Sequence, residues 1–459
     1  MRRRLAPLLV AAAVLGPAAP AGAHSAFLGS VPEPGQRLER TPAAIRLSFT
    51  EPLVRRLSKA RLIAVAGGRH VAASLHEVGT RRLELRPERD LARGAYRVEW
   101  RTVSTEDGHA LEGSFSFGVR TAAVGGAHDV EQSPLARGGI LRVAARLGFY
   151  AALLLFAGAL FLQALLPARA GLWIVPTSMR PELGTEGRER LLERYAAVVR
   201  DAGIAAIGLG AAVALLDALD AAGGFSPPDM SEYLLASAAG RARVTVVALL
   251  LAAALAARRV RRAPAVGAAG ALAAVALSGH ANSASPRTLA LLTDWVHLMG
   301  AATWAGGIAL IVAVWGPALR TLERGARLAV MRRVLERFGA VALPSFALLV
   351  ASGTVNAVIE LGTPSALLDS SYGGVLLVKV SLVAIIAAIS FQHAFRLRPR
   401  LLAVSAPIAE AAEQRHWLFV RSERVLVVAV AGLAALLVAF PLPPRQLADS
   451  DEARAAVPA

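Results

Sequence analysis

The residues best suited to chemistry lie in two short segments of the N-terminal part of the chain. His24 follows an Ala-Gly-Ala run at residues 21–23, which is typical of signal-peptide cleavage. Cleavage there leaves His24 with a free amine and an imidazole, two nitrogen donors for a metal ion once the amine is deprotonated. In the second segment, Asp107 and His109 flank one glycine, so on extended backbone both side chains point to one face of a sheet.

Nitrogen and oxygen ligands of this kind suit Cu(II), whereas Cu(I) prefers thiolates and thioethers. The chain has no cysteine, which excludes thiolate metal sites, disulfides and cysteine nucleophiles. No methionine occurs between His24 and Arg120 either. The spacing alone leaves another interpretation open, because an Asp-Gly-His tripeptide is more often a turn with a solvated histidine. His24, Asp107 and His109 are therefore candidate copper ligands at this point.

The hydropathy of the chain places most of it in lipid. It has 459 residues, 55% of them hydrophobic, and a mean hydropathy of +0.51, which is high for a soluble protein. The net charge of +17 does not indicate a nucleic-acid partner, because the arginines cluster in short loops between apolar runs. Arginines at 2–4 precede an apolar stretch over 5–15, which predicts a signal peptide over 1–23. An uncleaved membrane helix is the alternative, but the run is short for one.

The segment after the predicted cleavage site has the pattern of a small all-β domain. Apolar and polar residues alternate in short runs, for example Ile-Arg-Leu-Ser-Phe at 45–49, which is typical of half-buried strands. Turns rich in proline, glycine and charge separate these runs, so residues 24–120 predict an antiparallel sandwich or barrel. A linker rich in glycine and alanine follows over residues 121–139.

The rest of the chain predicts an all-α polytopic membrane domain of about eight transmembrane helices. An exported N-terminal domain places the loops after the first, third, fifth and seventh helices in the cytoplasm, and these loops are the arginine-rich ones. The positive-inside rule therefore supports all eight spans and puts both termini, including a tail over 442–459, outside the cytoplasm. The predicted domain covers residues 140–441, with helices at about 140–166, 195–217, 243–257, 264–279, 290–315, 338–359, 374–395 and 424–441.

Several motifs of the exported segment occur in the order found in one protein family. They are His-Ser-Ala-Phe at 24–27, Ser-Val-Pro-Glu-Pro-Gly at 30–35, Leu-Ser-Phe-Thr-Glu-Pro at 47–52, Tyr-Arg-Val-Glu-Trp at 96–100, Asp-Gly-His at 107–109 and Gly-Ser-Phe-Ser-Phe at 113–117. With them the segment resembles the periplasmic copper-binding CopC family. The resemblance implies an Ig-like Greek-key barrel or sandwich that binds Cu(II) through the amine and imidazole of His24, with Asp107 and His109 as the remaining ligands. Glu51 matches a family carboxylate near the site, where it would orient a ligand or water; a surface glutamate is the alternative interpretation.

Polar residues in the membrane half are informative because they are costly in lipid. The predicted fourth helix ends at His280, and the fifth begins with Asp294 and His297, one turn apart on one helix face. At about 1.5 Å per residue, His297 lies roughly 10 Å below the outer surface. We therefore predict an outward-facing cluster of His280, Asp294 and His297, a candidate copper path beneath the exported domain. For Lys379, snorkelling to the outer surface is an alternative to a functional role.

The membrane half also resembles a known family, the CopD membrane family, over its last four or five helices. The motifs are Gly-His-Ala at 279–281, Asp-x-x-His at 294–297 with Trp-x-Gly-Gly at 304–307, Ser-Gly at 352–353, and Tyr-Gly at 372–373 before Lys379. Fusions of CopC and CopD are associated with copper uptake or copper tolerance. The resemblance thus implies a protein of the bacterial plasma (inner) membrane in which copper passes from the exported domain to the membrane domain.

Copper acquisition is the function that we predict: Cu(II) is captured outside and copper is passed inward, as Cu(I) or Cu(II). Copper tolerance by extracytoplasmic sequestration is the closest alternative. A haem-bearing membrane redox protein is an alternative from another class, with His280 and His297 as axial ligands. The sequence contains no P-loop and no hydrolase constellation, so we expect a transporter rather than an enzyme. The expected partners are copper ions and the lipid bilayer, with a separate reductase or copper chaperone as a further candidate.

Overall fold

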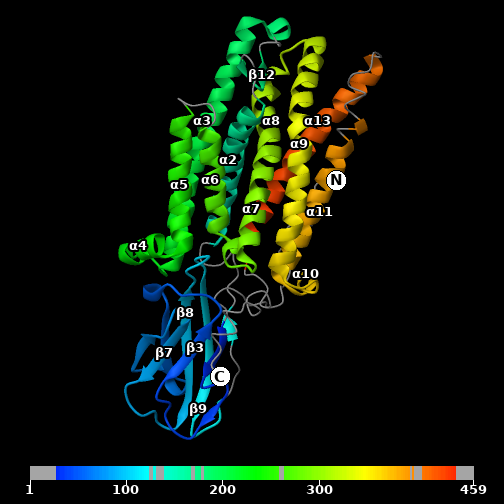
Figure 1. Ribbon diagram of the computed structural model, residues 1–459. Coiled ribbons are helices and arrows are strands. Elements are labelled where there is room, and N and C mark those ends of the chain that lie inside the picture. Colours follow the sequence, from blue (N-terminus) through cyan, green and yellow to red (C-terminus); the bar gives the residue numbers. More distant parts are fainter. Residues whose placement is uncertain are drawn as a thin grey trace.

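An all-β domain stands at one end of a bundle of long helices (Figure 1). The computed structural model describes residues 27–123, 128–130, 139–166, 171–176, 180–257, 263–392, 395–396 and 406–440. The predicted signal peptide over 1–23, the candidate ligand His24 and the predicted tail over 442–459 lie outside the described residues.

The β domain is a sandwich, because its strands turn their apolar residues inward from two sheets. One sheet has the order β1-β3-β7-β6, and the other has the order β10-β9-β8-β4-β5 with β2 parallel to β9. Phe49, Trp100 and Phe115 lie in the shared core. The two sheets do not close, so the structure selects the sandwich over the barrel. The strands are β1 (Phe27–Val31), β2 (Arg37–Leu38), β3 (Ile45–Phe49), β4 (Lys59–Ala64), β5 (Arg69–Val71), β6 (Ala73–Glu77), β7 (Arg82–Pro87), β8 (Gly94–Val103), β9 (Ala110–Val119) and β10 (His128–Val130).

The helical half has six to eight apolar helices in the described part of the chain, which agrees with the all-α membrane domain that the sequence predicts. Six of the described helices are long and apolar enough to cross a membrane, and two shorter apolar segments lie at Ala263–Leu277 and Val425–Leu437. The bounds are α2 (Gly139–Leu165), α3 (Arg180–Ala221), α4 (Pro227–Ala236), α5 (Ala238–Ala256), α6 (Ala263–Leu277), η4 (His280–Asn282), α7 (Arg287–Ala301), η5 (Ala302–Gly306), α8 (Gly307–Ala318), α9 (Arg324–Leu361), α10 (Ala366–Asp369), α11 (Ser371–Gln392) and α13 (Ala406–Leu437); a short hairpin joins β11 (Gly171–Leu172) to β12 (Val175–Pro176).

The turn η5 is a π-helical turn that makes α7 and α8 one continuous span. Glycines let α2 approach it closely: a Cβ on Gly158 would lie 2.2 Å from the Ala302 carbonyl oxygen, and one on Gly306 would lie 2.0 Å from that of Leu154. Small residues allow such backbone-to-backbone packing between membrane helices. The contact anchors α7, which carries Asp294 and His297.

The sandwich packs on the ends of α3, α4 and α5, and α4 lies across the foot of the bundle (Figure 1). Polar contacts support the packing. The Arg56 guanidinium lies 2.8 Å from the Asp229 carboxylate, and the Ala238 amide donates to the Thr105 carbonyl at 2.8 Å. The apolar part of the interface is one buried cluster of Val54, Leu57, Val103, Ala218, Ala221 and Tyr233.

A buried ion triad lies just inside the bundle. Asp217 of α3 accepts hydrogen bonds from Arg146 of α2 at 2.8 Å and from Arg243 of α5 at 2.7 Å. All three side chains are less than a tenth exposed. Since buried charges persist only when they are paired and hydrogen-bonded, the triad holds three helices in one arrangement beneath the sandwich.

Candidate metal centre

The hairpin turn between β8 and β9 carries the Asp-Gly-His motif. The two strands pair up to Val103 and Ala110, which leaves residues 104–109 to make the turn. Gly108 has a φ of 78°, so the segment is not extended and our premise of an alternating strand face is wrong. A glycine in this left-handed conformation instead folds the motif back on itself, and that brings Asp107 and His109 together.

Within the turn, Asp107 and His109 are in direct contact. The His109 amide donates to Asp107 Oδ1 at 3.0 Å, and His109 Nδ1 lies 3.2 Å from Asp107 Oδ2. Asp107 is fully buried and the His109 side chain is 18% exposed. The solvated histidine that a turn of this type usually carries is therefore not the arrangement seen here.

Gly108 is also the point at which the turn meets the helical half. A Cβ there would lie 2.5 Å from the Tyr233 hydroxyl oxygen, closer than atoms tolerate. Tyr233 of α4 is fully buried, so it cannot move aside into solvent. The glycine thus serves both the positive φ and the contact between the domains.

Glu51 joins the turn through a serine. Its carboxylate accepts a short hydrogen bond from Ser104 Oγ, and Ser104 Oγ accepts from the amides of Glu106 and Asp107 at 3.1 and 3.4 Å. Burial raises the pKa of Glu51 well above its ordinary value, and the neighbouring Asp107 carboxylate raises it further. Through Ser104, the Glu51 carboxyl group orients the turn.

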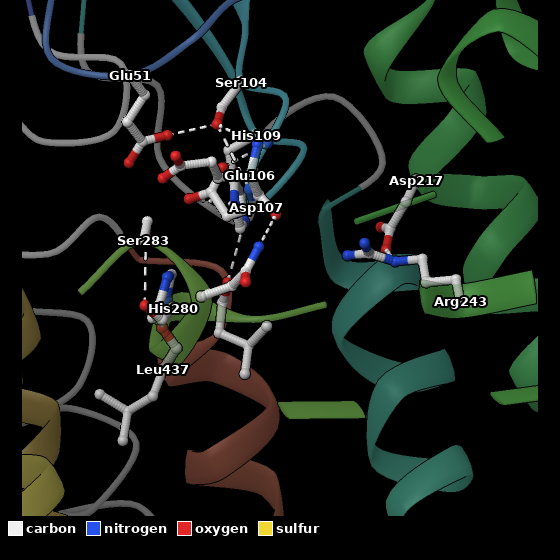
Figure 2. A network of polar contacts seen from close by, with 12 residues as sticks. Glu51, Ser104, Glu106, Asp107, His109, Asp217, Arg243, His280, Ser283 and Leu437 are labelled. Carbon is white, nitrogen blue, oxygen red and sulfur yellow. Dashed lines mark hydrogen bonds and ion pairs between the residues drawn. The ribbon is translucent and has the colours of Figure 1, made fainter. Parts of the chain in front are cut away.

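The third member of the cluster comes from the helical half. His280 begins the short turn η4 after α6, and its ring stacks on that of His109 with centroids 5.5 Å apart (Figure 2). One ligand atom each from Asp107, His109 and His280 lies within 4.8 Å of the others. Asn282 in the same turn donates to the Glu106 carbonyl at 2.8 Å, which ties η4 to the hairpin.

Consecutive carbonyl oxygens at the end of α13 orient the two imidazoles. His109 Nε2 lies 3.1 Å from the Val438 oxygen, and His280 Nε2 lies 3.3 Å from the Leu437 oxygen. A carbonyl only accepts, so both Nε2 atoms carry hydrogen, and a neutral ring then keeps its lone pair on Nδ1. This is the partner that metal-bound histidines usually have on their other nitrogen.

The lone pair of His109 Nδ1 faces a carboxylate oxygen. Two acceptors 3.2 Å apart repel each other unless positive charge lies between them. Either a proton on Nδ1 or a metal ion supplies that charge. The arrangement is thus suited to a cation that both groups bind.

The predicted cluster of His280, Asp294 and His297 is arranged differently in the structure, which groups His280 with the hairpin. His297 Nδ1 instead donates to the Leu349 carbonyl of α9 at 2.9 Å, and Asn356 donates to Asp294 at 3.4 Å. A Cβ on Gly353 would lie 2.8 Å from His297, so this glycine admits the imidazole against α9. Asp294 and His297 therefore lie on the face of α7 that packs against α9, and His280 lies in the cluster with Asp107 and His109.

Some contributors to the centre carry little signal in the sequence. The carbonyls of Leu437 and Val438 act through the backbone, and any residue could supply them. Asn282 and Tyr233 are ordinary polar residues until the two halves meet. Tyr372, whose ring meets that of His280, is visible in the sequence only as a helix start, and its hydrogen-bond partner Glu360 only as an acidic loop residue.

A β sandwich on a bundle of apolar helices, with a His/Asp cluster that could hold a metal ion between them, is the architecture of a multi-pass membrane protein. Sequence models of three families match the chain: the CopC domain over residues 27–120, the copper resistance protein D-like N-terminal domain over 138–287, and copper resistance protein D over 332–437. The chain belongs to the copper transport and resistance proteins, as a fusion of a CopC domain with CopD domains.

Individual relatives cover either the sandwich or most of the chain. Copper resistance protein C of Pseudomonas syringae pv. tomato is 36% identical over 107 residues, which are 22% of this chain and 83% of that protein. Copper transport protein CutJ of Bacillus subtilis is 26% identical over 447 residues, which are 92% of this chain and 75% of the relative. Among solved structures, PcoC, a methionine-rich copper resistance protein of Escherichia coli, is 31% identical with a TM-score of 0.20 and covers 21% of this chain and 99% of that one.

Proposed function

We propose that this protein binds Cu(II) at a centre shared by the sandwich and the helical half, and passes copper through the membrane half for import. The convergence of Asp107, His109 and His280 carries the proposal, because their ligand atoms lie within 4.8 Å although they come from two domains. Two imidazoles and a carboxylate are the nitrogen and oxygen donors that suit Cu(II). A shared centre gives the captured ion a direct exit into the bundle.

His24 is the fourth ligand in this proposal. β1 begins at Phe27, opposite Phe49 at the end of β3, and the chain after Phe49 leads to Glu51 beside the centre. Phe27 lies in the sheet that faces the hairpin strands, and its ring stacks on that of Trp100 of β8 with centroids 4.7 Å apart, three residues before β8 ends at Val103. His24 precedes Phe27 by three residues, a length of chain that spans at most about 10 Å. An amine and an imidazole from one residue would complete a set of nitrogen and oxygen donors.

The proposed orientation puts the sandwich and both termini outside the cytoplasm, in a bacterial inner membrane. The arginine-rich loops of the sequence support it, because the positive-inside rule assigns such loops to the cytoplasm. Relatives named for copper transport and copper resistance support copper as the cargo. Asp294 and His297 are the next ligands inward in this proposal.

Cellular copper content tests the direction of transport. We expect deletion of the gene to lower copper content at limiting copper. The wild-type gene should restore the copper content, and the His280→Ala gene should not. His70→Ala is the matched control, because His70 lies exposed on β5 and should restore copper content fully. Higher content after deletion would mean export, and unchanged content with altered tolerance would mean sequestration. Either result overturns import.

A competition titration of the purified full-length protein tests the shared centre. His280→Ala should weaken Cu(II) binding at least about tenfold, since the copper ion loses one of its proposed protein ligands. One residue added before His24 should weaken binding as well, because the free amine then moves away from the imidazole. Unchanged affinity in His280→Ala would confine the centre to the sandwich. A Soret band in the same preparation would favour the haem alternative.

A further inference from the structure

A second group of charged and polar side chains lies at the outer ends of α7, α9 and α11. Asp294 is in the third turn of α7, Glu360 is in the last turn of α9, and Lys379 is in the third turn of α11. All three side chains are half-buried before any lipid is considered. The Lys379 ammonium interacts electrostatically with both carboxylates, so the three groups form one charged network.

Tyr372 connects this network to the outer centre. Its hydroxyl donates a short hydrogen bond to Glu360, and its ring meets that of His280 edge to face with centroids 6.2 Å apart. Tyr372 is 4% exposed and packs in the same apolar cluster as Ala281 and Ile359. One side chain thus separates Glu360 from a proposed ligand of the outer centre.

Asn356 supplies an oxygen that the described residues leave unused. Its side chain is 9% exposed, and its Nδ2 donates to Asp294 Oδ1. Its Oδ1 is buried and has no hydrogen-bond partner in the described part of the chain. A buried amide oxygen without a partner costs free energy, and a cation beside Asp294 would remove that cost.

The network is rich in groups that can bind a cation. Two carboxyl groups and one amine share a region that lipid surrounds, where charge without a partner is costly. Carboxylate, phenol, amide and imidazole groups are nitrogen and oxygen donors, and no cysteine or methionine is among them. This composition favours a hard or borderline cation such as Cu(II) over Cu(I).

The choice of lysine is informative because the chain almost always uses arginine. Of its 50 lysine and arginine residues, lysine occurs only at 59 and 379. Arginine binds carboxylates with a rigid fork of donors, whereas lysine offers a compact charge on a flexible stem. Near two carboxyl groups, a lysine can withdraw toward the outer surface when another cation arrives.

We propose that Asp294, Glu360 and Asn356 form a second Cu(II) site inside the membrane half, and that the nearby Lys379 ammonium serves as its counter-ion until the copper ion binds. The proposal rests on the proposed function, since it supplies the step between His280 and His297. Lys379 is a tethered counter-ion in this scheme. It stabilises the carboxyl groups when no metal is bound, and it lowers the Cu(II) affinity of the site so that the ion can be released toward His297.

Equilibrium dialysis of the full-length protein against Cu(II) tests the site. We expect two bound equivalents in wild type and one in Glu360→Gln. Lys379→Met should keep two equivalents and bind the second about tenfold tighter or more, because the competing charge is gone. Lys379→Arg should weaken the second equivalent, because the forked guanidinium holds both carboxylates. Lys59→Arg is the matched control, since Lys59 is exposed on β4, and it should change neither equivalent.

The two centres can fail separately in this experiment. The first equivalent must survive in Glu360→Gln, which shows that the variant folds. Loss of only that first equivalent in His109→Ala assigns it to the outer centre. A second equivalent that is unaffected by both Glu360→Gln and Lys379→Met would overturn the inner site and leave the outer one standing. The outer centre alone would be overturned if neither wild type nor any variant binds the first equivalent, while the second equivalent still responds to Glu360→Gln and Lys379→Met.

Discussion

The triad around Asp217 should be the most sensitive polar feature of the helical half. In Asp217→Asn, the amide oxygen can still accept from one arginine, but the amide nitrogen then points donor to donor at the other. Both contacts are short, at 2.8 and 2.7 Å, and all three side chains are less than a tenth exposed. Breaking a buried pair by removing one partner costs about 3–5 kcal/mol, and we expect a loss in this range.

The same helix offers a control. Asp201 of α3 pairs with Arg200, but their side chains are 65% and 63% exposed, so Asp201→Asn should cost at most about 1 kcal/mol. The free energy of unfolding is measured by denaturant titration in mixed micelles. If Asp217→Asn and Asp201→Asn lose the same small amount, the triad does not hold the three helices together and our reasoning about it fails.

Two further predictions concern the sandwich. Gly108→Ala should weaken Cu(II) binding in the full-length protein. The positive φ alone costs an alanine about 1–2 kcal/mol, and the added Cβ meets Tyr233. Unchanged Cu(II) affinity in a competition titration would contradict this role of Gly108. Hydrogen bonds from Arg46 and Arg86 lower the pKa of Glu84, so its contribution to stability is present above the ordinary value of 4.5 and is lost as the pH falls through the lowered pKa. Acid unfolding of the sandwich should therefore be less steep in Glu84→Gln, and an unchanged acid transition would count against this assignment.

The sequence predicts what depends on hydropathy and local pattern. Alternation at 45–49 gives β3, and apolar length places the helices, because burial of apolar side chains dominates both choices. The short helix α4 was not predicted, because apolar length identifies only helices long enough to span the membrane. Ser226 before two prolines is nevertheless a recognisable helix start.

The composition of the candidate metal centre could be predicted only in part. Asp107 and His109 are close in sequence, and the motif itself marks them. His280 was expected beside Asp294 and His297 because helix rise gives depth in the membrane, but depth does not tell which way a loop turns. The turn at η4 faces the hairpin because Asn282 bonds to the Glu106 carbonyl, a contact between segments that no local pattern encodes.

The two imidazoles of the outer centre hydrogen-bond to carbonyl oxygens at the end of α13, but they belong to different domains. If the sandwich tilts away from the bundle, the bond from His109 to the Val438 carbonyl breaks, whereas the bond from His280 to the Leu437 carbonyl stays within the helical half. His280 therefore keeps its orientation when the sandwich moves, and His109 does not. In the proposed transfer, a copper ion on His280 would meet an imidazole that is still aligned, whereas His109 would have lost the carbonyl that aligned it.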